Sequence, residues 1–360
     1  MLFHNTDIPL ELINASRNGN LVIFAGAGVS RQNPLRLPDF NNLVLSIKSK
    51  VDLADRFEPF NRETMSCEQY LGRLEDRYDI RSATADLLDT KGKTTELHKN
   101  IIRLFPSNEN IRIVTTNFDN AFEYALDELG LSEVKSYYCP ALPLGNSFSG
   151  IVYAHGSIHE TGNMILTSAD FGKAYVTQGW ASRFLVSLFS RYTVLFIGYS
   201  CQDVLVDYLT RSISDEMEGH VYALARNGEN SDDWRMRGVK VIPFDNYADL
   251  PSIFEKWSEH NKTTTFRRIK RIHEIASREQ LSEEDKAFLI ECLTWPDERE
   301  RSIFSREFFD KSKCISHLRL LLNGKITYDG VSINADSWGS SFIQWICEAF
   351  AIEQFSKLVN

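Results

Sequence analysis

The sequence has few cysteines, no long hydrophobic run and no excess of basic residues, and each shortage excludes a class of protein. The six cysteines include no CxxC pair, so we read them as reduced thiols of a cytoplasmic protein. The longest apolar stretch, residues 21–29, is far too short to cross a bilayer, so no membrane partner is expected. A net charge of −9 disfavours direct nucleic-acid binding, because contact with a phosphate backbone needs a surplus of Lys and Arg.

Apolar runs of strand length recur along the first two thirds of the chain, and helical patterns lie between several of them. This alternation predicts an α/β fold with a Rossmann-like open parallel sheet. The expected strands are residues 21–25, 111–114, 151–154, 164–166, 194–197, 221–225 and 239–243. The expected helices include residues 8–18, 121–129 and 182–192.

Two further regions have helical patterns and no chemical motif. Residues 40–105 predict a helical insertion that leans over the sheet's ligand site. After about residue 255, helical patterns at 266–275, 287–293 and 315–322 predict a helical C-terminal domain, with a capping box at Ser282. We therefore divide the chain into a nucleotide-binding domain (1–255), which contains the insertion, and a C-terminal domain (256–360).

A glycine turn follows the first expected strand. Residues Gly26, Ala27, Gly28 and Ser30 would bring backbone N–H groups and a helix N-terminus to a phosphate, since glycine permits close approach. The pattern GxGxS departs from the usual GxGxxG fingerprint, and the acidic residue expected about 20 positions later is missing. A tight strand-to-helix turn without a ligand is the alternative.

Polar residues follow the strand at 111–114. Asn117 is suited to grip ribose hydroxyls or to orient a water. We take Asp119 as a further catalytic candidate and Thr116 as a candidate for binding the nucleotide. Asp119 has the alternative role of capping the helix that begins near Asn120.

A histidine ends the strand at 151–154. His155 titrates near neutral pH and would take a proton from a ribose hydroxyl or a water. The alternative is a buried histidine that bonds to the backbone. His159, four residues later, is either a second partner or a loop residue.

A second glycine turn follows the strand at 194–197. Gly198, Ser200 and Asp203 would face the adenosine half of a dinucleotide, unless Ser200 or Asp203 merely caps the next helix. All four motifs fall at C-terminal strand ends, where open parallel sheets bind their ligands. The sequence therefore predicts one nucleotide site.

The order GAGVS, LPDF, TTNFD, AHG and GYS resembles the sirtuin family over roughly residues 15–250. The resemblance implies that the turn at Gly26 to Ser30 holds the NAD pyrophosphate. It also implies that Asp39 and Phe40 lie near the nicotinamide, that Asn117 and His155 are catalytic, and that Gly198 and Ser200 lie near the adenosine.

Residues 156–193 contain no cysteine, so the four-cysteine zinc module of deacylating sirtuins is absent and no zinc is expected. The closer resemblance is to bacterial sirtuin-domain effectors of anti-phage defence, which deplete NAD when triggered. This implies an NAD hydrolase, with NAD as substrate, held at rest by homo-oligomerisation or by a regulatory partner. A zinc-free deacylase or ADP-ribosyltransferase, and a non-catalytic NAD or ADP-ribose sensor, are the alternatives.

Overall fold

The structure is a computed structural model that describes residues 2–53, 56–199, 220–228, 231–236 and 238–276, and a few residues beyond. The later residues are 278, 282, 285, 288, 327–328 and 331–332. The chain divides into two compact units, Met1–Asn261 and Lys262–Asn360.

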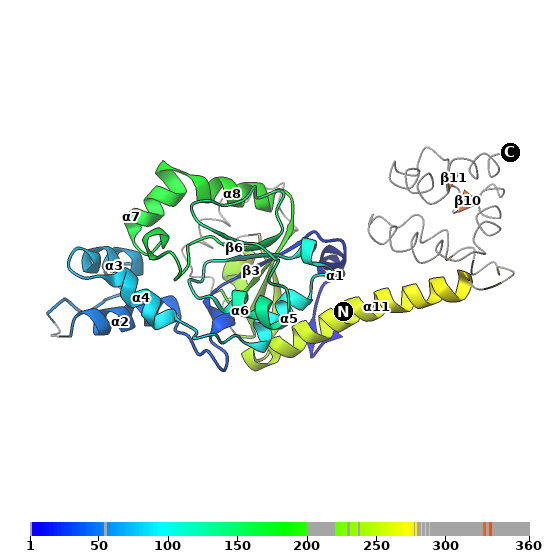
Figure 1. Ribbon diagram of the computed structural model, residues 1–360, viewed down its shortest axis with the longest axis horizontal. Helices are drawn as coiled ribbons and strands as arrows, with labels where there is room; N and C mark the ends of the chain where they lie inside the picture. Colours follow the sequence, from blue (N-terminus) through cyan, green and yellow to red (C-terminus); the bar gives the residue numbers. More distant parts are fainter. Residues whose placement is uncertain are drawn as a thin grey trace. The chain divides into compact units, whose positions relative to one another are not determined.

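A parallel sheet of seven strands forms the centre of the first unit, in the spatial order β5-β6-β4-β3-β7-β8-β9. Figure 1 labels two of its strands, β3 and β6. The strands are β3 (Leu21–Ala25), β4 (Arg112–Thr115), β5 (Ser136–Tyr138), β6 (Gly150–Tyr153), β7 (Thr193–Ile197), β8 (Val221–Arg226) and β9 (Lys240–Phe244). The predicted Rossmann-like sheet is confirmed. The chain passes from β3 to β4 on one side and returns to β7 on the other, so a ligand crevice is expected at the C-terminal end of β3.

Successive side chains of β3 point to opposite faces of the sheet and contribute to a hydrophobic layer on each face. Leu21, Ile23 and Ala25 pack in one buried cluster, whereas Val22 and Phe24 pack in another. The first layer is completed by helices α1 (Leu10–Arg17), α5 (Glu96–Arg103), α6 (Ala121–Glu128) and the start of α11 (Leu250–Ala276). The second is completed by α8 (Trp180–Phe189) and by α10 (Ser231–Arg235). All five residues of β3 are buried, as a central parallel strand requires.

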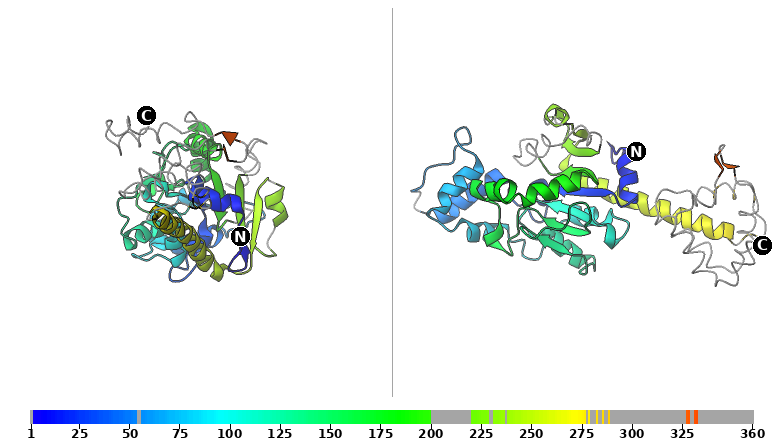
Figure 2. Two further views of the ribbon diagram at one scale, coloured as in Figure 1. Left: turned by 90° about the vertical axis from the view of Figure 1, so that its right-hand side faces the viewer. Right: turned by 90° about the horizontal axis from the view of Figure 1, so that it is seen from above.

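Residues 40–105 are helical and contain no strand among their described residues. Helices α2 (Phe40–Val51), α3 (Cys67–Glu75) and α4 (Ile80–Leu88) share their own small core, and the view from above in Figure 2 shows them grouped at one end of the sheet. Phe118, Met164 and Leu166 join that core. The last helix of the range, α5, packs instead on the sheet layer.

Arg81 ties this helical group to the loop that follows β6. Its guanidinium donates to the Met164 carbonyl at 2.7 Å, to Asp170 at 2.8 Å and to Glu75 at 2.6 Å. Asp170 in turn accepts from the backbone N–H groups of Leu166 and Thr167. One half-buried cation therefore joins α4 to the segment beside His155.

Arg81→Met is expected to lower the free energy of unfolding by about 1–3 kcal/mol, because partly buried acceptors lose a charged donor. The matched control is Arg73→Met, since Arg73 pairs with Glu58 at an exposed site and such pairs contribute about 0–1 kcal/mol. Urea unfolding of both variants measures the difference. Equal losses of unfolding free energy in the two variants would show that the Arg81 contacts stabilise the fold no more than an exposed ion pair does.

The structure corrects the predicted strands in two places. Residues Met164, Ile165 and Leu166 are buried but form no strand. Their apolar character reflects packing under the helical insertion, and Ile165 N–H donates to the His155 carbonyl instead of to a sheet partner. Conversely, β5 was not predicted, because this three-residue edge strand is only half-buried and has no apolar run.

The described residues of the second unit include the end of α11 and a two-stranded antiparallel pair, β10 (Thr327–Tyr328) with β11 (Val331–Ser332). Ser282 Oγ accepts from Asp285 N–H at 3.1 Å, and the Asp285 carboxylate accepts from Ser282 N–H at 3.2 Å, which confirms the predicted capping box. The helices expected at 287–293 and 315–322 lie, apart from Phe288, outside the described residues.

Within the described part of the chain, no helix has both the length and the apolar character needed to span a membrane. Cys67 and Cys139 are free and buried there.

Candidate active site

The glycine turn after β3 is shaped by the turn after β7. Gly26 N–H donates to the Ile197 carbonyl at 2.8 Å, and Gly28 N–H donates to the Gly198 carbonyl at 2.9 Å. A Cβ atom added to Gly28 would lie 2.6 Å from Gly198 Cα. The two glycines therefore permit backbone-to-backbone packing. Their N–H groups are used inside the protein, so the pyrophosphate contact expected of them would need other groups of the turn.

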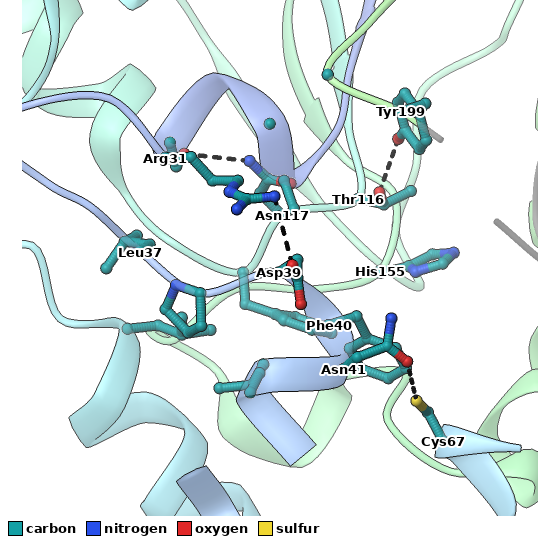
Figure 3. Close-up of a pocket in the computed structure, with 18 of the residues that line it drawn as sticks. Arg31, Leu37, Asp39, Phe40, Asn41, Cys67, Thr116, Asn117, His155 and Tyr199 are labelled. Carbon is teal, nitrogen blue, oxygen red and sulfur yellow. Dashed lines mark hydrogen bonds and ion pairs between the residues drawn. The ribbon is translucent and has the colours of Figure 1, made fainter. Parts of the chain in front are cut away.

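A pocket of about 900 Å³ lies at the C-terminal edge of the sheet and extends under the helical insertion. Figure 3 shows Asn117 and His155 in this pocket together with the Asp39–Arg31 ion pair. The expected site residues that line it are Ala27, Gly28, Ser30, Asp39, Phe40, Thr116, Asn117, Asp119, His155 and Gly198. Ser200 and Asp203 lie outside the described residues.

The orientation of the Asn117 amide is fixed by its neighbours. Asn117 Nδ2 donates to the Gly26 carbonyl and to Ser30 Oγ, both at 3.2 Å. The Gly26 carbonyl only accepts hydrogen bonds, so the NH₂ group must face it. Both donors are thereby used, and the carbonyl Oδ1 is the atom of this side chain that remains for a ligand.

Asp119 lies behind Asn117 and is almost completely buried. Its Oδ2 accepts from Ser30 Oγ at 2.9 Å, and its Oδ1 accepts from Ala121 N–H at 3.1 Å, at the start of α6. Burial raises the pKa of Asp119 to about 6, although both hydrogen bonds act in the opposite direction. The carboxylate thus accepts from the first residue of α6, although the N-cap of that helix is Asn120 and not Asp119, and it also bonds to Ser30 of the site.

The raised pKa predicts an unusual dependence of stability on pH. Because the pKa of Asp119 is about 6 in the folded chain and 3.8 ordinarily, the folded state binds this proton more tightly. Its contribution to the free energy of unfolding therefore falls as the pH rises from about 4 to about 6. Urea unfolding across this range should show wild type losing stability relative to Asp119→Asn. A difference that is constant with pH would contradict the raised pKa.

His98 is a buried member of this group that the sequence analysis did not identify. Its Nε2 lies 3.4 Å from Ser30 Oγ, and its Nδ1 lies 2.7 Å from Thr95 Oγ1. His98 is on α5, in a pattern that indicates only an amphipathic helix. Nothing in its local sequence points to Ser30, 68 positions earlier.

His155 faces the pocket from the end of β6 and is mostly buried. Its Nε2 lies 2.8 Å from Tyr175 Oη, and its ring meets those of Phe171 and Tyr175 edge-on. Burial lowers the pKa of His155 to about 3, so the imidazole is neutral at physiological pH. Tyr175 belongs to the π-helix Gly172–Thr177, which periodicity did not predict.

His159 lies away from this pocket. Its Nε2 bonds to Glu123 at 2.9 Å, its side chain is half exposed, and it does not line the pocket.

Asp39 and Phe40 enter the pocket at the start of α2. Asp39 caps this helix by accepting from Asn42 N–H at 2.9 Å, and its second oxygen pairs with Arg31 at 3.4 Å. Arg31 was not among the predicted site residues. It is more than half exposed at the pocket wall, where it supplies positive charge near the glycine turn.

Thr116 supports the opposite wall. Its hydroxyl lies 2.7 Å from Tyr199 Oη (Figure 3). Tyr199 also donates to the Ala25 carbonyl at 3.3 Å. The Tyr199 ring packs against Phe24 and Phe196. Thr116 is therefore tied to the turn after β7.

Among the residues that the structure describes, no group of three or more His, Cys, Asp or Glu side chains is arranged to hold a metal ion. The polar groups of the pocket are three amides, an imidazole, a thiol, hydroxyls, carboxylates and guanidinium groups.

Residues 111–242 match the SIR2-like domain. Similar proteins include the uncharacterized protein y4cA of Sinorhizobium fredii, which is 30% identical over 268 residues, 66% of this chain and 22% of that protein. The NAD(+) hydrolase ThsA of Bacillus cereus is 25% identical over 276 residues, 68% of this chain and 55% of that protein. The Defense-associated sirtuin 2 of Bacillus subtilis is 23% identical over 210 residues, 55% of this chain and 20% of that protein.

The chain thus spans between about a fifth and about half of the length of these relatives. The matches confirm the expected resemblance to sirtuin-like defence proteins.

Proposed function

We propose that this chain, which carries a SIR2-like domain, hydrolyses NAD⁺ at the bond between nicotinamide and ribose and releases nicotinamide and ADP-ribose. The observation that carries the proposal is the meeting of Asn117 and His155 in one pocket. The amide carbonyl of Asn117 supplies a hydrogen-bond acceptor at the sheet edge where dinucleotides bind, and the neutral imidazole of His155 supplies a second at Nδ1 when its Nε2–H donates to Tyr175 Oη. Relatives named NAD(+) hydrolase support the choice of NAD⁺.

The reaction needs only a weak base in the site. The bond to nicotinamide breaks with its electron pair leaving on the nicotinamide nitrogen, through an oxocarbenium-like ribose. A water then bonds to the anomeric carbon, and its proton is lost to complete the hydrolysis. Because that water becomes strongly acidic as it bonds to the cationic carbon, a weak base suffices. A histidine with a pKa near 3 is therefore compatible with this role, at the weak end of general bases.

The pocket residues have distinct proposed roles. Asn117 holds a ribose hydroxyl or the attacking water through Oδ1, and His155 accepts the proton. Asp119 acts indirectly, because its carboxylate accepts a hydrogen bond from Ser30 and so holds that hydroxyl in place. The insertion residues that line the pocket, such as Phe40, exclude bulk water from the cationic intermediate. Arg31 faces the negative pyrophosphate.

We further propose a role in anti-phage defence through depletion of cellular NAD⁺, which the relatives named ThsA and Defense-associated sirtuin 2 support. Such an activity must be held at rest in an uninfected cell. We therefore propose control by homo-oligomerisation or by a regulatory partner.

Two histidine variants test the hydrolase. His155→Ala should lower the rate of nicotinamide release by about 10²-fold or more, because the proton acceptor is lost. The matched control, His159→Ala, should retain wild-type activity, since this nearby histidine points to Glu123. Both rates are measured by chromatography with NAD⁺ as the sole substrate. Activity that survives in His155→Ala would contradict the proposed role.

A further inference from the structure

We propose that His98 is a positioning residue that holds the Ser30 hydroxyl and, through it, the Asn117 amide in the productive orientation. The proposal rests on the function assigned to Asn117 above. His98 does not line the pocket, so it acts on the substrate only through the residues it contacts.

The hydrogen atoms of this cluster can be assigned from the acceptors alone. Ser30 has one O–H donor and two acceptor positions. Its hydroxyl donates to Asp119 at 2.9 Å, so its two other partners must donate to it. Those partners are Asn117 Nδ2 at 3.2 Å and His98 Nε2 at 3.4 Å. Ser30 therefore has all three of its hydrogen-bonding positions filled inside the protein.

This assignment also fixes the tautomer of His98. Because Nε2 carries the proton, Nδ1 must accept, and Thr95 Oγ1 donates to it at 2.7 Å. Thr95 Oγ1 itself accepts from the His98 backbone N–H at 3.3 Å, as the cap of α5. Burial keeps the imidazole neutral by lowering its pKa to about 3. A single direction of donation thus runs from Thr95 through His98 and Ser30 to Asp119.

Packing holds the imidazole in this place. The side chain is fully buried, and its ring meets Phe122 of α6 edge-on with ring centres 4.6 Å apart. The cluster consequently joins α5, α6 and the glycine turn behind Asn117. Loss of the His98 donor would leave a Ser30 acceptor unfilled and free the hydroxyl to turn, so the Asn117 amide would lose a fixed partner.

Three variants separate positioning from mere stability. His98→Leu removes the donor while it retains an apolar side chain of similar size. His98→Gln can restore an N–H donor toward Ser30. Leu97→Ala is the matched control, because Leu97 is also buried on α5 but belongs to the hydrophobic layer behind the sheet.

We expect His98→Leu to lower kcat for NAD⁺ by about 10–10²-fold with KM changed by less than about threefold, because the misplaced groups act mainly on the transition state. His98→Gln should recover most of kcat. Leu97→Ala should keep kcat even where its Tm falls as far as that of His98→Leu. Equal kcat losses in His98→Leu and Leu97→Ala would overturn the proposal.

A second readout does not need enzymatic activity. The Ser30 hydrogen bond lowers the pKa of Asp119, so weakening it in His98→Leu should raise that pKa above its value of about 6. NMR titration of ¹³C-labelled aspartate, assigned with Asp119→Asn, measures the shift in wild type, His98→Leu and Leu97→Ala. The titratable neighbour on α6, Glu123, is unchanged in all three.

A shift in His98→Leu alone supports the coupling of His98 to Asp119, whether or not the chain turns over NAD⁺. An unshifted pKa in His98→Leu overturns it. Failure of wild type to cleave NAD⁺ would instead reject the proposed function, and the titration would still decide whether His98 controls the cluster.

Discussion

Asn117→Ala is expected to lower kcat for NAD⁺ cleavage by about 10²–10³-fold. The substitution removes the Oδ1 acceptor that faces the ligand. It also removes one of the two donors to the Gly26 carbonyl, which still accepts from Val29 N–H, and one of the two donors to Ser30 Oγ, which still accepts from His98 Nε2, at a cost of about 1–3 kcal/mol of unfolding free energy. Steady-state rates and urea unfolding, measured on the same preparation, distinguish the two effects.

Two further substitutions sharpen this prediction. Asn117→Asp has nearly the same shape but places an oxygen against the Gly26 carbonyl, so it should also be inactive. Asn163→Ala is the control, because this exposed side chain bonds only to Glu160 in the described structure. Near-wild-type turnover by Asn117→Asp would show that the fixed orientation of the amide is unimportant.

Gly28→Ala is expected to lower the free energy of unfolding by about 2–4 kcal/mol and to abolish NAD⁺ cleavage. The added methyl group would lie 2.6 Å from Gly198 Cα and 2.9 Å from the Gly198 carbonyl oxygen. Both are backbone atoms, so the contact cannot be relieved by rotating a side chain. One of the two turns must move, and the Asn117 amide, which bonds to Gly26, would move with it.

The control for this prediction is Gly162→Ala. Gly162 lies in an exposed turn, and no atom would come within 4 Å of an added methyl group. Its replacement should change stability by less than about 1 kcal/mol and leave the rate unaltered. Indistinguishable urea unfolding curves for Gly28→Ala and Gly162→Ala would refute the close packing of the two glycine turns.

The sheet and the position of the site were predictable because they follow from local patterns. The apolar run at Leu21–Ala25 has the length and composition of a buried central strand, and it is one. Motifs at the C-terminal ends of parallel strands must meet at one edge of the sheet, so the sequence predicts that Asn117 lies near His155, and both line one pocket.

Partners brought together by the fold were not predictable in this way. His98 meets Ser30 only because α5 packs beside the glycine turn, and Tyr175 reaches His155 from a π-helix. The apolar residues Met164–Leu166 show the same limit, since a short buried run does not reveal whether it pairs in a sheet or packs under helices. The need for glycine at position 28 likewise comes from a second turn, because the backbone of Gly198 packs directly against it and no local pattern reveals that contact.

The most direct test of the central claim is the stoichiometry of products from NAD⁺ as the sole substrate. Wild type and Asn117→Ala are incubated in parallel, and nicotinamide and ADP-ribose are quantified over time by chromatography. We predict that wild type releases the two products in equal amounts and that the variant releases almost none. Release of nicotinamide only when an acyl-lysine peptide or another acceptor is added would contradict the claim, as would equal rates from both proteins.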